Sequence, residues 1–390
     1  MKDKVAIVGM GCSKFGERWD CGLDDLLIEA AYEAYEDAGI GPEEIDICYF
    51  SSGTLTSQAA SVVADSLMLR NIPILRNENY CCSGHVAMFD AWLAVASGAY
   101  KVAMAIGAEK LKDSGFGGIG TGRGMTPVRE ARRTAPGSFA QIAMHYFEEY
   151  GISYDEGRKL LAQIAVKNHD NGFLSPRAHF HKKITVEDAL KAPIVATPYG
   201  LFDCCGNSDG ASAAIFVSAD IARSFRDDPV YVKGFSIAMD PVLPHYRPNF
   251  NWIDFDALKV SSQKAYKMAG IRDPRAELDM AEVHDCFTGT ELIIYENFGF
   301  SQRGGARGDI ESKFFERSGG LPVNVDGGLK CFGHPVGASG IRMTYECYKQ
   351  LQHKVDNPER QLGKCDIALS HTFGGGPQIS AVLITGNSKG

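Results

Sequence analysis

The chain has 390 residues, of which 45% are hydrophobic, and a formal net charge of −8. A chain of this length buries a large core in more than one lobe, and the absence of a basic stripe argues against a nucleic-acid partner. No apolar run reaches the about 18 residues of a membrane-spanning helix, and the first residues resemble a strand rather than a signal peptide. The 11 cysteines are odd in number and lack C-x-x-C spacing, which predicts free thiols in a reducing cytoplasm.

Strand-like and helix-like patterns alternate along the first part of the chain. Residues 5–9 form a continuous apolar run that suits a buried strand, and residues 23–38 have helical spacing that ends at Gly39. Residues 45–50 and 102–107 have the pattern of two further strands. The alternation predicts a parallel sheet that is covered by helices on both faces.

The same pattern recurs in the second part of the chain. The segment AYEDAGI at residues 34–40 is echoed by AYKMAGI at residues 265–271, and each is followed within a few residues by an apolar strand. The apolar residues 230–234, upstream of the second copy, match the first strand of the chain. We therefore predict two similar α/β halves, residues 1–225 and 226–390.

An inserted region at about residues 110–203 interrupts the alternation and is expected to form a loop-rich binding surface or lid, with one helix from about residue 135 to 150. Its glycines at residues 115–124 match G-x-G-x-x-G, but they do not open a helix directly, so a dinucleotide site is not expected. The nearby Arg129, Arg132 and Arg133 either meet phosphates or form a solvated basic surface.

Cys81 and Cys82 stand directly before an apolar, helix-like run. Between residues 83 and 100 the only side chain charged at neutral pH is Asp90, so a helix here belongs in the protein interior. The N-terminal dipole and unpaired N–H groups of such a helix would stabilise a thiolate and lower the pKa of that cysteine. A small buried hydrophobic residue is the alternative role for either cysteine.

Two histidines have settings that suit a functional site. His284 follows an expected strand at residues 278–283, and the carboxyl ends of strands are where α/β sites gather. His334 lies in the glycine-dense segment 327–340, just before an expected helix at residues 341–351. Taken singly, a histidine in such a setting more often has a structural role than a catalytic one.

Taken together, these motifs resemble those of the thiolase family. Cys81-Cys-Ser-Gly84 is similar to the family's C-x-S-G nucleophile motif, Gly333-His-Pro-Val-Gly337 to its G-H-P-x-G motif, and Gly374-Gly-Gly376 to its final glycine loop. The H-D-C-F sequence that begins at His284 is typical of sterol-carrier-protein-type thiolases and archaeal acetoacetyl-CoA thiolases. The resemblance implies a duplicated five-layer αβαβα fold with an inserted loop region.

The resemblance also implies roles for individual residues. Cys81 occupies the nucleophile position, and His334 would take its proton. His284, with a water molecule, would stabilise the enolate oxygen, and backbone N–H groups near Cys81 and Gly376 would stabilise the tetrahedral intermediate. Cys82 falls on the variable position of the motif and is expected to pack.

One position departs from the general pattern of the family. Thr372 stands where most thiolases carry their second catalytic cysteine, and a hydroxyl is a poor acid there. In the sterol-carrier-protein-type relatives the cysteine of H-D-C-F takes this role, so Cys286 is expected to protonate the enolate. A core thiol is the alternative for Cys286, and His371 stays without an assigned role.

The resemblance implies a 3-oxoacyl-CoA thiolase that uses CoA as co-substrate, holds no permanent cofactor and also runs the reverse Claisen condensation. Acetoacetyl-CoA, or a bulkier 3-oxoacyl-CoA such as benzoylsuccinyl-CoA, is the expected substrate. A ketoacyl-synthase-like condensing enzyme and a non-thiolytic lyase or scaffold subunit remain open.

Further expectations concern partners and metals. A homodimer or tetramer is expected, with a small zinc-ribbon and OB-fold (DUF35) protein as a possible partner, while the residues that contact CoA stay unassigned. No metal site is expected, because the pairs His179, His181 and Cys204, Cys205 lack zinc-site spacing. The segment 203–211 resembles a thiolase segment and is expected to support the site.

Overall fold

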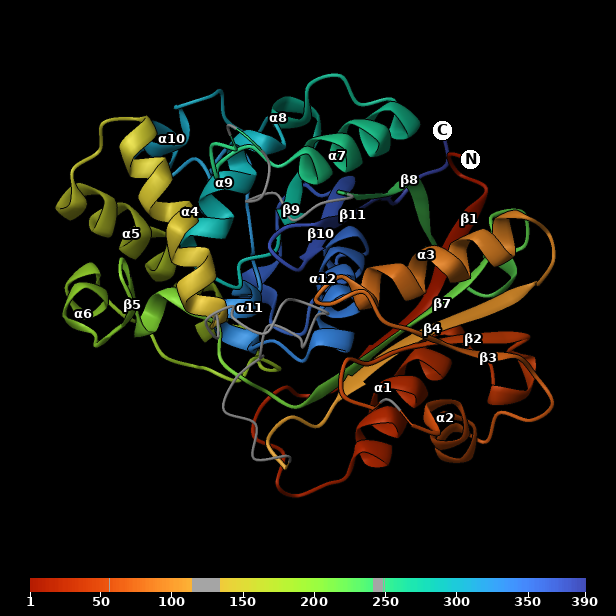
Figure 1. Cartoon of the computed structure of the whole chain (residues 1–390). Helices are drawn as coiled ribbons and strands as arrows, with labels where there is room; N and C mark the ends of the chain where they lie inside the picture. The colour runs from red at the N-terminus through yellow and green to blue at the C-terminus, as the bar shows by residue number, and fades with distance from the viewer. Residues whose placement is uncertain (56, 114–133, 241–247, 249) are drawn as a thin grey trace.

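The computed structural model describes the chain except for residues 56, 114–133, 241–247 and 249 (Figure 1). The glycine-rich segment 115–124 and the three arginines Arg129, Arg132 and Arg133 lie outside the described residues. Among the described helices, none is long and apolar enough to cross a membrane. All 11 cysteines are free thiols, as their spacing predicts.

Within the described residues, one nine-stranded sheet forms the centre of the molecule, with the strand order β3-β2-β4-β7-β1-β8-β11-β10-β9. The sheet consists of two parts that meet where β1 pairs with β8 at only two residue pairs. The strands are β1 (Val5–Cys12), β2 (Ile47–Ser51), β3 (Ile74–Asn77), β4 (Val102–Glu109), β7 (Gly210–Ser218), β8 (Val230–Met239), β9 (Met280–Glu282), β10 (Ile367–Gly374) and β11 (Ile379–Gly386).

The two parts of the sheet have the same internal order, read outward from their junction. β1 pairs antiparallel with β7, as β8 does with β11, and the parallel pair β2–β4 corresponds to the parallel pair β9–β10. The prediction of a parallel sheet is wrong for the four central strands β7, β1, β8 and β11, each of which runs antiparallel to both neighbours. No helix lies between β10 and β11, and a short connection of this kind joins antiparallel strands.

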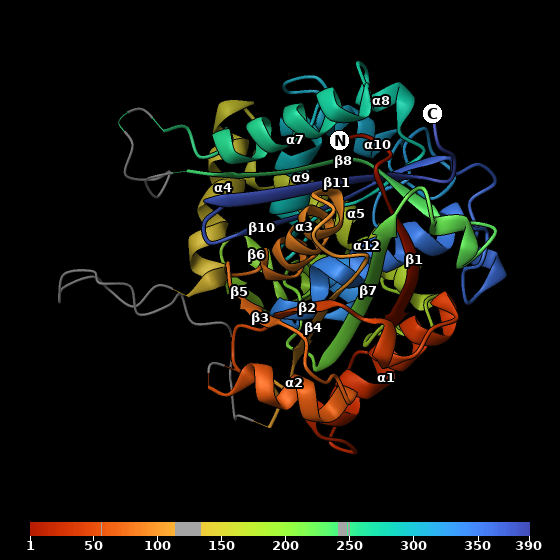
Figure 2. The ribbon, with the colours of Figure 1, turned by 90° about the vertical axis from the view of Figure 1, so that its right-hand side faces the viewer.

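Helices enclose the two parts of the sheet and also separate them. α3 and α12 lie between the parts, with α3 packed on β4 and β2, and α12 packed on β7, β4 and β10. α1 covers the outer face of one part, and α7 covers the outer face of the other, which completes five layers from α7 to α1 (Figure 2). The bounds are α1 (Leu23–Ala38), α2 (Ala59–Leu67), α3 (Ser83–Ala96), α7 (Asp256–Ala269) and α12 (Val336–Leu351).

Glycines in the strands allow the outer helices to approach the sheet closely. A Cβ atom on Gly11 in β1 would overlap the carbonyl oxygen of Ala30 in α1, and one on Gly234 in β8 would overlap that of Ala265 in α7. The close strand–helix contact therefore occurs in both parts of the fold. The mixed α/β architecture and its internal duplication agree with the sequence pattern.

The region between β4 and β7 is largely helical where the structure describes it. The helix expected from about residue 135 is present as α4, whereas α5 and α6 had no counterpart in the sequence prediction. α4 and α5 pack on α9, the helix that follows His284, so this region covers one side of the second half (Figure 1). The remaining elements are α4 (Ala135–Glu149), α5 (Tyr154–Phe173), α6 (Val186–Lys191), β5 (Ile194–Ala196), β6 (Tyr199–Gly200), α8 (Pro274–Glu277), α9 (Thr288–Asn297), α10 (Ala306–Glu311) and α11 (Gly328–Phe332).

Candidate active site

Three predicted site residues from distant parts of the chain meet at one point. Cys81 lies just before α3, His284 follows β9, and His334 precedes α12. The sulfur of Cys81 and ring nitrogens of the two histidines all lie within 4.8 Å of one another. The two imidazole rings meet edge to face, with centroids 5.1 Å apart. The middle-layer helices α3 and α12 therefore begin at the same site, one from each half of the fold.

The hydrogen bonds of His334 define which of its nitrogens carries the proton. Nδ1 lies 2.8 Å from the hydroxyl of Ser339, and that hydroxyl donates to the carbonyl oxygen of Pro335 at 2.9 Å. A hydroxyl has a single hydrogen, so Ser339 accepts a hydrogen bond from Nδ1–H of His334. Nε2 then carries the lone pair, and it has no hydrogen-bond partner within the described structure. His334 thus presents a basic nitrogen at the site.

Cys81 and His334 form a neutral pair in the resting site. Burial raises the pKa of Cys81 to about 12, and the carboxylates of Glu78 and Glu109 act in the same direction. Burial lowers the pKa of His334 to about 3. The pKa of Cys81 is therefore shifted upward, opposite to the direction expected for a thiol at a helix N-terminus, and burial is the largest cause. Formation of the thiolate requires transfer of its proton to a base during the reaction.

His284 is a fully buried side chain whose ring nitrogens have no hydrogen-bond partner among the described residues. Its ring packs against Phe373 with a centroid distance of 4.2 Å. Burial lowers the pKa of His284 well below its usual value, and the neighbouring histidines contribute to this shift. The imidazole is therefore neutral, and both nitrogens are available to a ligand.

Cys286 is buried near the same site, with its sulfur 3.8 Å from the hydroxyl of Thr290. Burial raises the pKa of its thiol well above the usual value, and the nearby thiols of Cys205 and Cys81 add to the effect. The backbone N–H of Cys205 donates to the carbonyl oxygen of Cys286 at 2.9 Å, and that of His334 donates to Gly206 at 2.9 Å. The segment 203–211 therefore connects the loops that carry Cys286 and His334.

Asp285 fixes the backbone that leads to His334. Its carboxylate accepts the N–H groups of Leu329 at 2.7 Å and Lys330 at 3.2 Å, at the start of α11. It also accepts the side-chain amide of Asn168 at 2.9 Å. Burial and the neighbouring Glu291 carboxylate raise the pKa of Asp285 to about 7.

Glu109, at the end of β4, is a second positioning carboxylate, and the sequence analysis missed it. The side chain is fully buried and accepts the N–H group of Gly337 at 3.1 Å and the hydroxyl of Ser52 at 3.1 Å. It also accepts the N–H group of Gly53. Glu109 thus ties the G-H-P-x-G loop to the end of β2, and burial raises its pKa. The available signal was an acidic residue two positions after the predicted buried strand at residues 102–107.

Cys82 and Thr372 face each other on the other side of the Cys81 backbone. Cys82 is fully buried, and its thiol donates to the carbonyl oxygen of Thr372 at 3.5 Å. The Thr372 hydroxyl lies 2.8 Å from Nδ1 of His85, a buried histidine that the sequence analysis did not single out. His371 points to the opposite face of β10, where its Nε2 lies 3.2 Å from the hydroxyl of Ser380.

The final glycine loop lies against the segment that leads to Cys81. A Cβ atom on Gly374 would lie 2.6 Å from the carbonyl oxygen of Asn79 and 2.9 Å from the Cβ of Tyr80. Around Gly376, by contrast, an added Cβ would meet no described atom within 4 Å. The loop therefore lies against the residues that precede Cys81, with open space beside Gly376.

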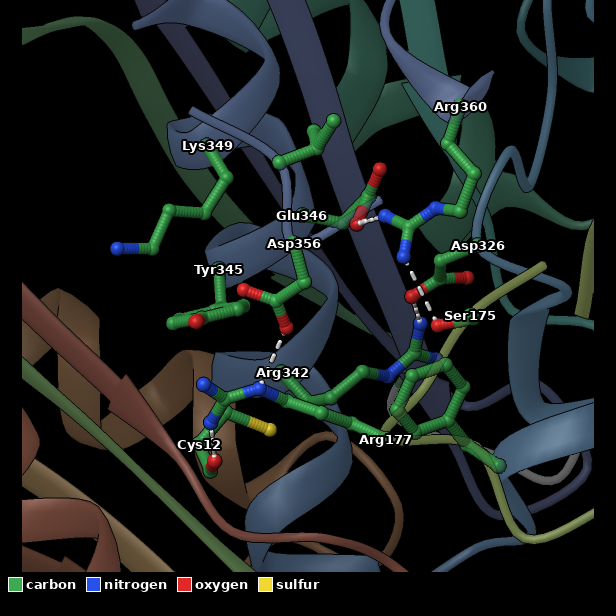
Figure 3. Close-up of a pocket in the computed structure, with 12 residues that line it drawn as sticks. Cys12, Ser175, Arg177, Asp326, Arg342, Tyr345, Glu346, Lys349, Asp356 and Arg360 are labelled. Atoms are coloured by element: carbon green, nitrogen blue, oxygen red, sulfur yellow. Dashed lines mark hydrogen bonds and ion pairs between the residues drawn. The ribbon is translucent and has the colours of Figure 1, made fainter. Parts of the chain in front are cut away.

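A separate polar cavity lies beside α12 and is lined by paired charges and by the thiol of Cys12 (Figure 3). Arg177 pairs with Asp356 at 2.7 Å, Arg342 pairs with Asp326, and Arg360 pairs with Glu346. The cavity has a volume of about 10 Å³, which is room for about one water molecule. These ion pairs connect side chains across the cavity, which is too small to hold a substrate.

Comparison with known proteins identifies the family. Residues 5–220 match the model of the thiolase N-terminal domain, and residues 245–387 match the thiolase C-terminal domain-like model. The chain is 36% identical over 391 residues to an acetyl-CoA acetyltransferase of Methanothermobacter thermautotrophicus, covering 98% of this chain and 99% of that protein. It is 30% identical over 383 residues to the benzoylsuccinyl-CoA thiolase subunit BbsB of Thauera aromatica, covering 96% of each. The chain therefore belongs to the thiolase family.

Within that family it is an acyltransferase of the thiolase type, and its relatives are consistent with the H-D-C-F subtype. The solved structure of an Ltp2-ChsH2(DUF35) aldolase has the same fold, with a TM-score of 0.83 and 22% identity over 99% of this chain and 98% of that chain. At this identity the likeness concerns the fold alone.

Proposed function

We propose that the chain is a 3-oxoacyl-CoA thiolase that forms an acyl-thioester on Cys81. The observation that carries the proposal is the convergence of Cys81, His284 and His334, whose reactive atoms lie within 4.8 Å of one another. A thiol beside a free imidazole nitrogen is the arrangement of an activated nucleophile.

The first half-reaction couples a proton transfer from Cys81 to its attack on the substrate. His334 Nε2 takes the proton of Cys81 while the sulfur attacks the 3-oxo carbon of the substrate. Because both groups are neutral at rest, proton transfer and attack occur together. The bond between C2 and C3 then breaks, the acyl group stays on Cys81, and the CoA-bound half leaves as an enolate.

Two sets of donors would stabilise the negative charges that develop. The tetrahedral oxyanion would be held by backbone N–H groups of Cys81 and Gly376, a role supported by the contact of the glycine loop with residues 79–80. The enolate oxygen would be held by His284 with a water molecule. Its unpartnered ring nitrogens are consistent with this role.

Cys286 would complete the cycle. Its thiol would protonate C2 of the enolate, and its thiolate would then take the proton of the incoming CoA thiol. That CoA sulfur attacks the acyl-thioester and forms the second product, while the Cys81 sulfur leaves as a thiolate and takes back the proton held by His334. The raised pKa of Cys286 means that the thiol is protonated at rest, as an acid must be. The reverse sequence is a Claisen condensation.

The names of the relatives restrict the substrate class. Acetoacetyl-CoA is the simplest candidate, in line with the acetyl-CoA acetyltransferase relative, and a bulkier aromatic 3-oxoacyl-CoA is supported by the benzoylsuccinyl-CoA thiolase relative.

A partner of the DUF35 type is supported by the structural neighbour, which is an aldolase that contains a DUF35 protein. Self-association is supported by strand β3, which ends the sheet within the described structure and exposes Leu75. Light scattering with and without a candidate partner tests both assemblies.

The test is CoA-dependent cleavage of a panel of 3-oxoacyl-CoAs. Cys81→Ser is expected to abolish cleavage. Cys82→Ala is the matched control and is expected to keep cleavage, because the Cys82 thiol is hydrogen-bonded to the carbonyl oxygen of Thr372 and is not part of the group formed by Cys81, His284 and His334. Activity only with carrier-protein substrates would favour the condensing enzyme. Cleavage that persists in Cys81→Ser and needs no CoA would favour the lyase.

A further inference from the structure

The three side chains at the centre of the site also have the composition of a metal-binding site. A thiol sulfur and nitrogens of two imidazoles lie within 4.8 Å of one another. His284 and His334 are buried, with 0% and 1% of their surface exposed. Three of their nitrogens, both of His284 and Nε2 of His334, have no hydrogen-bond partner among the described residues. Buried imidazole nitrogens of this kind are ready to bind a ligand.

We propose that Cys81, His284 and His334 bind one Zn²⁺ ion, with water in the fourth position. Thiolate and imidazole are the ligands that zinc prefers, and three protein ligands plus an open position form a common tetrahedral site. Zinc bond lengths of about 2.0–2.3 Å place ligand atoms roughly 3.3–3.6 Å apart. The present limit of 4.8 Å lies above that range, so binding requires the three side chains to move closer together.

The surroundings of the three ligands favour this site over the other cysteines and histidines. Nδ1–H of His334 is held by Ser339, which orients Nε2 toward the site as an outer hydrogen bond does for a zinc-bound histidine. His179 and His181 are engaged elsewhere, with the Ser208 hydroxyl at 2.6 Å and the Ala178 carbonyl oxygen at 2.8 Å. Spacing along the sequence could not reveal the site, because its ligands are some 50 to 253 positions apart in the chain.

The binding step is a simple exchange of a proton for a metal ion. The Cys81 thiol releases its proton to solvent as the sulfur–zinc bond forms, the imidazoles donate lone pairs, and no electrons are transferred. A zinc-bound sulfur is no longer free to attack a carbonyl carbon or an alkylating reagent. Zinc and an acyl-CoA therefore exclude each other; this last consequence rests on the proposed function, whereas binding itself does not.

The test uses the purified full chain after removal of metals by a chelator. Titration with Co²⁺ is expected to give a thiolate-to-cobalt charge-transfer band and four-coordinate visible bands that saturate at one ion per chain and are displaced by Zn²⁺. The charge-transfer band is expected to vanish in Cys81→Ser and to weaken in His284→Asn and His334→Asn. Cys82→Ala is the matched control, because it removes the adjacent thiol and is expected to keep the spectrum.

A second readout needs no variant. One equivalent of Zn²⁺ is expected to slow alkylation of Cys81 by iodoacetamide at least about tenfold, as measured on the Cys81 peptide, and a chelator is expected to restore it. Unchanged alkylation of Cys81 at saturating Zn²⁺, or an equal Co²⁺ spectrum in Cys81→Ser, overturns the proposal. If metal binds as expected but no 3-oxoacyl-CoA is cleaved by the metal-free chain, the zinc site stands and the proposed function fails.

Discussion

Ser339→Ala removes one hydroxyl that holds the proton of His334 on Nδ1. In the wild-type chain, Nδ1 and the Ser339 hydroxyl are 2.8 Å apart, which leaves the lone pair of Nε2 for Cys81. Without the hydroxyl, a buried N–H group loses its acceptor, at a cost of about 1–3 kcal/mol. The imidazole then either keeps the unpaired Nδ1–H or moves the proton to Nε2, where it no longer accepts the proton of Cys81.

The lost hydrogen bond is expected to raise the activation barrier of proton transfer from Cys81 to His334. About 1.4 kcal/mol corresponds to tenfold in rate, so we expect kcat to fall roughly 10- to 100-fold with little change in KM. The assay is steady-state thiolysis together with single-turnover acylation of Cys81. Ser339→Thr restores the hydroxyl and is expected to recover most of the loss.

The matched control for Ser339→Ala is Thr344→Val, which removes another buried hydroxyl of α12. The Thr344 hydroxyl donates to the Gly340 carbonyl oxygen at 3.1 Å and lies 2.8 Å from the Ser370 hydroxyl, away from His334. Its kcat is expected to stay near the wild-type value. Equal losses in both variants, or none in Ser339→Ala, would refute the reasoning about the proton on His334.

Three further predictions concern charge and burial. Because the pKa of Cys81 is raised to about 12, its alkylation rate is expected to rise tenfold per pH unit from about pH 6 to 9, and a plateau would contradict the neutral pair. The pKa of Asp285 is raised to about 7, so the folded state holds a proton that the unfolded chain releases near pH 4. Urea titrations give the free energy of unfolding of the wild type and of Asp285→Asn at each pH. The difference, wild type minus variant, is therefore expected to fall by up to about 1.4 kcal/mol per pH unit as pH rises from about 4 to 7. A difference that does not change with pH would count against this shift of the Asp285 pKa. Glu109→Gln places a side-chain NH₂ group against the backbone N–H donors of Gly53 and Gly337, so we expect the free energy of unfolding in urea to fall by about 1–3 kcal/mol. The exposed Glu36→Gln is the control and is expected to lose nothing. Equal stabilities of the two variants would contradict the role of Glu109 in holding these loops.

Sequence patterns correctly predicted the features that depend on the residues of a single helix or turn. The almost uncharged run after Cys82 predicted a buried helix, and α3 is that helix. The repeated AY-x-x-AGI segments predicted a duplication. In both copies the helix, α1 or α7, is followed by a glycine in the left-handed conformation, Gly39 or Gly270. Such features depend on local composition and on turn geometry alone.

Other features depend on tertiary structure and could not be predicted. α5 lacks a clear apolar stripe, because it buries polar side chains such as Lys167, which pairs with Glu291 at 2.8 Å. The direction of the pKa shift at Cys81 depends on how much water the surrounding chain excludes, which no local pattern records. The distances among the three central residues exist only because β9, α3 and α12 bring their ends together.

Peptide mass spectrometry after brief exposure to 3-oxoacyl-CoAs without free CoA tests directly whether Cys81 is the nucleophile. A thiolase working through Cys81 leaves an acyl adduct on the Cys81 peptide that is absent in Cys81→Ala and is discharged when CoA is added. The mass of the adduct also identifies the acyl half of the substrate. An adduct on another cysteine, or none from any substrate with or without a DUF35-type partner, would contradict the assignment of Cys81 as the nucleophile of a thiolase.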